Sequence, residues 1–148
     1  DPTVTPTPQH PIESWDGMES GWMSFSHPSK YIQSAVYDSL GYVWAVTANR
    51  VMRWDIETLV FEDMTPKEDA LGDFYEVLFH DGEIWITAEK GAALYFDAEW
   101  AVYRLDDSSV FSSFSYTGGT LWAVAQARFD GVFLADVFYL ENQIWQKF

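Results

Sequence analysis

The sequence predicts an all-β protein built from three consecutive copies of one unit of about 40 residues. The phrase Gly-x-aliphatic-Trp occurs three times, and its tryptophans, 41 and 37 residues apart, are Trp44, Trp85 and Trp122. A second phrase, an aromatic residue followed three positions later by another large apolar residue, recurs in step with the first at 22–25, 61–64, 100–103 and 145–148. No stretch carries apolar residues at helical spacing, so very little helix is expected.

Each unit is predicted to contain four short strands. In the second unit, "DFYEVLFH" alternates apolar and polar residues, "DGE" is typical of a tight hairpin, and "IWITA" is apolar enough to be covered on both faces. The four strands expected there are 73–80, 84–88, 92–97 and 99–105.

The first and third units follow the same order. The strands expected in the first unit are 31–38, 42–47, 50–55 and 59–64, and those in the third are 110–116, 121–125, 131–138 and 143–148. The third unit is longer, and its extra residues fall in "FDGVFLADVFYLEN", residues 129–142.

Four antiparallel strands in about 40 residues are typical of one blade of a β-propeller. We therefore expect one domain at 20–148 with blades at about 20–64, 65–105 and 106–148. "DSLGYVWAVT" followed by "VMRWD" resembles the two-component-regulator propeller repeat and, more distantly, the streptogramin-lyase-like propellers. The second and third copies lack the Arg-Trp-Asp of the first. The resemblance implies a propeller of the kind that often serves in ligand sensing or as a scaffold.

Three blades are too few for a closed ring, because closed propellers have about four or more. The chain is therefore expected to be either half of a six-bladed ring, closed by two copies, or a fragment of a larger propeller. The phrase at 22–25 has no blade of its own. It could add to the edge of a partner or be the remnant of another blade, and both alternatives stay open.

Residues 1–19 are predicted to be a largely disordered tether rich in proline and threonine, because "DPTVTPTPQHP" can form neither helix nor ladder. Such spacers are common in exported bacterial proteins, so an extracellular or surface-tethered location is expected. The chain has no cysteine, which excludes disulfides and thiolate chemistry.

The net charge of −15 comes from 23 acidic and 8 basic residues. Nucleic-acid binding requires clustered Lys and Arg, so no nucleic-acid partner is expected. No apolar run approaches the ~20 residues that cross a bilayer, so no membrane span is expected.

No catalytic constellation is visible, so the protein is expected not to be an enzyme. The histidines are His10, His27 and His80, and there is no Gly-x-Ser-x-Gly elbow. His80 stands beside Asp81 but lacks a further partner in the sequence. The carboxylates in the turns do not have calcium-loop spacing, so no metal or cofactor is expected. A lyase-like enzyme is the weakest alternative.

Most basic residues fall at one end of the predicted sheets, where the loops between units and between second and third strands meet. They are Lys30, Arg50, Lys67, Lys90 and Arg128, and three of them follow their unit's tryptophan by 5 or 6 residues. The opposite end receives only acidic residues, at 38, 55, 57, 81, 83, 97, 99 and 141. One hypothesis is a ring of cations around the central channel that binds an anionic ligand. The alternative is a chance distribution of solvated loop residues, and it is favoured by carboxylates at 68, 69, 89, 106 and 107 on the cationic end.

The function that these observations favour is a non-catalytic extracellular binding or assembly module that self-associates through its blade faces. The alternative is a receptor or lectin-like binder of an anionic oligosaccharide at the cationic loops. The tryptophans of the first phrase are expected to pack between blades, and those of the second phrase, Trp22, Trp100 and Trp145, to lie on the outer rim.

Overall fold

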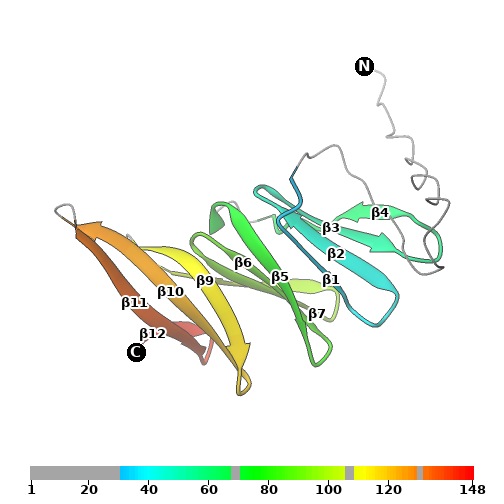
Figure 1. Cartoon of the computed structure of the whole chain (residues 1–148). Helices are drawn as coiled ribbons and strands as arrows, with labels where there is room; N and C mark the ends of the chain where they lie inside the picture. The colour runs from blue at the N-terminus through cyan, green and yellow to red at the C-terminus, as the bar shows by residue number, and fades with distance from the viewer. Residues whose placement is uncertain (1–30, 68–70, 106–108, 130–131) are drawn as a thin grey trace, which may run out of the picture.

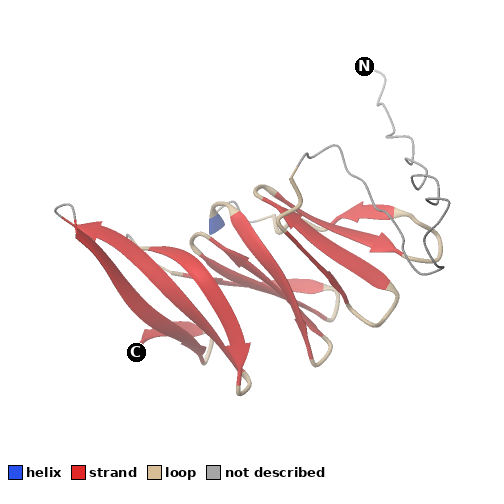
Figure 2. Ribbon diagram, in the orientation of Figure 1, coloured by secondary structure: helices blue, strands red, loops and turns tan. Residues whose placement is uncertain are grey.

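The computed structural model describes residues 31–67, 71–105, 109–129 and 132–148, with the side chains of 127–133 excepted. The predicted tether at 1–19, the phrase at 22–25 and Lys30 lie outside these ranges. The described chain forms three antiparallel four-stranded sheets and no α-helix (Figures 1 and 2). The predicted all-β fold of three four-stranded units is therefore confirmed. None of the described segments is a long apolar helix that could cross a bilayer.

Each sheet is a meander in which the strands follow one another in chain order. The first sheet contains β1 (Ser34–Tyr37), β2 (Tyr42–Thr47), β3 (Arg50–Asp55) and β4 (Phe61–Asp63). The second contains β5 (Phe74–His80), β6 (Glu83–Ala88), β7 (Gly91–Phe96) and β8 (Glu99–Arg104). The third contains β9 (Val110–Thr117), β10 (Thr120–Phe129), β11 (Val132–Glu141) and β12 (Ile144–Lys147).

The extra length of the third unit lies in its central hairpin. β10 and β11 have 10 residues each, whereas β6 and β7 have 6 each. The sequence predicts shorter strands here, because the apolar phrase "LWAVA" ends at Ala125. Main-chain pairing continues beyond it to Phe129 and Val132.

Local sequence explains the tight turns. Between β5 and β6, Asp81 and Gly82 have φ values of 48° and 85°. A turn with two such residues matches the twist of the strands it joins, and Asp-Gly is a preferred pair for it. Gly91, at the start of β7, has a φ of 153°, and a Cβ there would lie 2.2 Å from the carbonyl oxygen of Tyr103. The close approach of β7 and β8 thus requires glycine.

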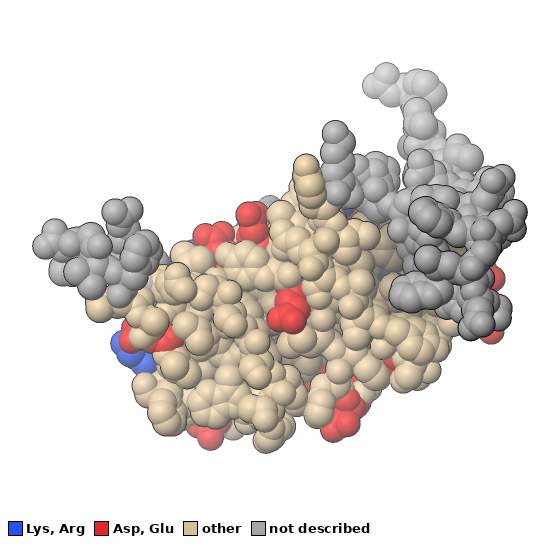
Figure 3. All heavy atoms as spheres, in the orientation of Figure 1, with Lys and Arg blue, Asp and Glu red and all other residues tan. Residues whose placement is uncertain are grey.

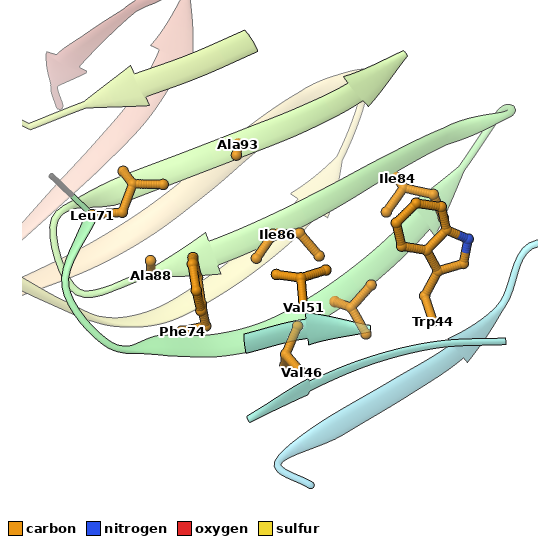
Figure 4. Packing of buried hydrophobic residues seen from close by; sticks show 10 residues of the cluster. Trp44, Val46, Val51, Leu71, Phe74, Ile84, Ile86, Ala88 and Ala93 are labelled. Atoms are coloured by element: carbon orange, nitrogen blue, oxygen red, sulfur yellow. The ribbon is translucent and has the colours of Figure 1, made fainter. Parts of the chain in front are cut away.

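The three sheets pack face to face in a row, with the second sheet in the middle (Figure 1). One buried cluster joins the first and second sheets, and another joins the second and third. In the first cluster, Trp44, Val46 and Val51 of the first sheet point toward Ile84 and Ile86 of the second (Figure 4). The first and third sheets lie at opposite ends of the row, so the described chain does not close a ring.

β6 is covered on both sides, as its apolar sequence predicts. Ile84 and Ile86 belong to the cluster shared with the first sheet, at 3% and 0% exposure. Trp85, at 6% exposure, belongs to the cluster shared with the third sheet. The middle sheet is therefore the core of the molecule.

Candidate functional site

The repeated tryptophan begins a four-residue patch that recurs on one face of each sheet. In the first sheet, Trp44 pairs across strands with Arg53, and Val46 pairs with Val51. These residues share a face because side chains alternate along a strand. Trp44 is 1% exposed and both valines are 0% exposed. The second sheet thus buries the three apolar residues of this patch, whereas Arg53 stays partly exposed.

The second sheet repeats the arrangement. Trp85 pairs with Leu94, and Thr87 pairs with Ala92. Thr87 and Ala92 are fully buried. The Trp85 ring lies 6.2 Å from that of Tyr116 on β9. This patch is covered by the third sheet.

The third sheet carries the same patch on its far side, where no described sheet follows. Here Trp122 pairs with Tyr139, and Val124 pairs with Val137. Val137 is 39% exposed, and Phe148, whose ring is 5.9 Å from Trp122, is 83% exposed. We call Trp122, Val124, Val137, Tyr139 and Phe148 the third-sheet patch. It is an apolar face similar to the faces of the first and second sheets that are buried between sheets.

The indoles of the first two patches are fixed by carboxylates. Trp44 Nε1 donates to Asp38 Oδ2 at 2.9 Å, and Trp85 Nε1 donates to Glu83 Oε2 at 3.0 Å. Asp38 also accepts from two main-chain N–H groups of the β1–β2 turn. It is only 3% exposed, so this acid, which the sequence analysis placed among the loop carboxylates, is a buried structural group. The sequence signal that could have indicated this role is the Asp of "DSLG", which stands six residues before Trp44.

The third unit has no carboxylate in either position. Six and two residues before Trp122 stand Tyr116 and Thr120. Within the described part of the chain, the Trp122 indole N–H has no hydrogen-bond acceptor. Its N–H therefore remains available to an acceptor outside the sheet.

The tryptophans of the closing strands join neighbouring sheets. Trp100 Nε1 donates to the carbonyl oxygen of Met64, and Trp145 Nε1 donates to that of Tyr103, both at 2.9 Å. In both cases the acceptor is the fourth residue of the preceding phrase. The expected position on the outer rim is wrong for Trp145, which is 8% exposed and belongs to the cluster between the second and third sheets. Trp100 is partly buried, and Trp22 lies outside the described residues. The sequence analysis did not identify the hydrogen bonds that Trp100 and Trp145 make between sheets.

Arg53 is a further residue whose role was missed. Its guanidinium lies 4.5 Å from the centre of the Tyr42 ring and 5.3 Å from that of Trp44, and it forms an ion pair with Glu62. A planar cation on aromatic faces is favourable when partly desolvated. The sequence offered only an unexplained Arg in the middle of an apolar strand.

Two of the cations in the predicted ring, Arg50 and Lys90, have partners within the chain. Arg50 Nη1 lies 3.1 Å from Asp63 Oδ2, and Lys90 Nζ donates to the carbonyl oxygen of Ser109 at 2.8 Å. Lys67 is exposed, whereas Lys30 and the Arg128 side chain lie outside the described residues. Acidic side chains stand out along the edges of the molecule in Figure 3. The anionic-ligand site stays a prediction.

The acidic end of the second hairpin holds the one histidine among the described residues. His80 Nε2 lies 3.2 Å from Asp81 Oδ2, and its ring is 4.3 Å from that of Tyr116. Burial, together with the nearby Glu83 and Asp81 charges, raises the pKa of Tyr116, which therefore stays a neutral phenol. The described residues contain no cluster of three metal-ligating side chains.

A shallow groove of about 350 Å³ follows the outer rim between β4 and β8. Its apolar lining comes from Met64, Pro66, Tyr95, Trp100 and Val102, and Lys67 stands at its edge. Trp100 and Met64, which are hydrogen-bonded to each other, both line the groove, so the groove lies at the contact between the first and second sheets.

No family model matches this chain, and no curated protein sequence matches it.

Proposed function

We propose that the protein is a non-catalytic binding or assembly module, made of propeller-type blades, that works by packing a blade face against a partner. The observation that supports this is the third-sheet patch. The equivalents of Val137 on the first and second sheets, Val51 and Ala92, are both 0% exposed, whereas Val137 is 39% exposed. Phe148, which lies beside Trp122 in the same patch, is 83% exposed. Sheet faces of this composition are stable in water mainly when another layer covers them.

The propeller-type arrangement is supported by three meandering four-stranded sheets that pack face to face in chain order. It is also supported by the repeated hydrogen bond from each closing-strand tryptophan to the preceding sheet. An extracellular location rests on the composition of residues 1–19.

The test is the mass of the full chain in solution, measured by multi-angle light scattering over a range of concentrations. An assembly module is expected to exceed the chain mass of 17.0 kDa as the concentration rises. A chain that stays monomeric at every concentration, with a sharp cooperative unfolding transition, would contradict self-assembly.

The geometry gives less support to the second candidate, a receptor for an anionic oligosaccharide. Arg50 and Lys90 each have an intramolecular partner, and a ligand would have to displace Asp63 from Arg50.

A further inference from the structure

The third-sheet patch differs from every other described sheet face. The four inner faces of the row are buried against one another at two interfaces, one for each cluster. The far face of the first sheet is also buried, because Ala45, Met52 and Trp54 are 1%, 0% and 4% exposed. Among the described sheets, the far side of the third is therefore the one face that remains open.

This asymmetry bears on how two copies can meet. A ring closed head to tail joins the third sheet of one copy to the far face of the first sheet of the next, which is already buried. An isologous contact joins the same patch on both copies and needs only a face that is open. In a second copy the open face is again the third-sheet patch, so an isologous contact would join the two third-sheet patches.

The charges favour the same contact. Two chains of net charge −15 repel each other over most of their surfaces. By strand alternation, the open face presents Ser113, Ser115, Gln126 and Gln146 around the patch, and Glu141 is its one Asp or Glu among the described side chains. Two such faces can approach without bringing many carboxylates together.

We infer that the protein forms a twofold dimer in which the third-sheet patches of two copies pack face to face. This rests on the proposed assembly function and specifies its partner as a second copy of this chain.

The size of the face sets the expected affinity. Four strands about 4.8 Å apart and about 25 Å long cover on the order of 500 Å². This is below the roughly 800 Å² per partner of a standard stable interface, so a weak dimer in the micromolar range is expected.

The experiment compares two glutamate variants of exposed aliphatic residues on β11. Val137→Glu places a charge in the centre of the patch, and Leu134→Glu places one on the opposite side of the same strand, at 52% exposure. Sedimentation equilibrium should show that Val137→Glu weakens dimerisation at least about tenfold, since it brings two like charges together. Leu134→Glu should dimerise as the parent does. Equal dimerisation of all three chains would overturn the inference.

A second measurement identifies the geometry. The chain has no cysteine, so Ser115→Cys, on the open face of β9, introduces a single thiol. A short bis-maleimide should convert this variant into a covalent dimer, because both thiols lie in the same interface. A chain that is dimeric in solution but is not cross-linked would overturn the face-to-face dimer and leave the assembly function standing. A chain that is monomeric throughout would overturn both.

Discussion

The indole nitrogen of Trp100 donates a hydrogen bond of 2.9 Å to the carbonyl oxygen of Met64, and this bond ties the last strand of the second sheet to the first sheet. Trp145 makes the equivalent bond to Tyr103 one sheet later. The aromatic phrase in the last strand of a sheet therefore also fixes the position of that sheet against the preceding one. The aromatic phrase of the fourth strand thus has two roles: it forms a strand, and its tryptophan makes the hydrogen bond that joins two neighbouring sheets. We call this hydrogen bond the joint.

The first prediction concerns this joint. Trp100→Phe and Trp145→Phe each keep an aromatic ring but leave a carbonyl oxygen without its partner. Each should lower the free energy of unfolding by about 0.5–1.5 kcal/mol, the net contribution of one hydrogen bond, because both bonds are only partly buried. Urea denaturation measures this. Trp122→Phe is the matched control and should change stability far less, and equal losses at all three sites would refute the role of the joint.

The second prediction compares equivalent tryptophans. Trp85 is 6% exposed between two sheets, whereas Trp122 lies on the open face. Trp85→Ala should destabilise the fold by about 3–5 kcal/mol, as large truncations in a core do. Trp122→Ala, measured at protein concentrations low enough to keep the chain monomeric, should cost clearly less. Similar losses would mean that Trp122 is as well packed within one chain as Trp85 is, and that the third-sheet patch is not an open face.

The third prediction concerns Arg53 on β3. Arg53→Lys replaces a planar group stacked on Tyr42 and paired with Glu62 by a point charge. The loss should be about 0.5–1 kcal/mol of unfolding free energy. Arg50→Lys, on the same strand, changes only an exposed pair with Asp63 and should be nearly neutral. Thermal unfolding of the two variants measures these losses. If Arg50→Lys lost more stability than Arg53→Lys, the aromatic contact of Arg53 would not be the stabilising one.

The fourth prediction concerns pH. Burial raises the pKa of the half-buried Glu76 above its usual 4.5. A raised carboxyl pKa means that the folded chain holds the proton more tightly than the unfolded one. The folded state is therefore favoured below pH 4.5 and loses this advantage as the pH rises through the folded pKa. Glu76→Gln should be more stable than the parent at pH 7, and the difference should shrink toward pH 4. A constant difference across that range would exclude the mechanism.

The sequence predicts the strands well because apolar alternation and Asp-Gly turns are local signals. β6 and the β5–β6 turn were predicted almost to the residue for this reason. The partners of Trp44 and Trp100 could not be predicted, because Asp38 reaches the indole only after β1 and β2 pair, and Met64 is 36 residues from Trp100. The internal partners of Arg50 and Lys90 also depend on how separate segments meet, so a pattern of loop charges could not reveal them.

The central claim is that the third-sheet patch becomes buried when two copies associate, and hydroxyl-radical footprinting at Trp122 tests it most directly. Trp44 and Trp85 are internal references, because they are 1% and 6% exposed within a single chain. At low micromolar concentration Trp122 should be oxidised several-fold faster than either reference. At high concentration its oxidation should fall toward theirs, while that of the references stays unchanged. A Trp122 oxidation rate that does not depend on concentration, in a chain whose measured mass has doubled, would contradict the account.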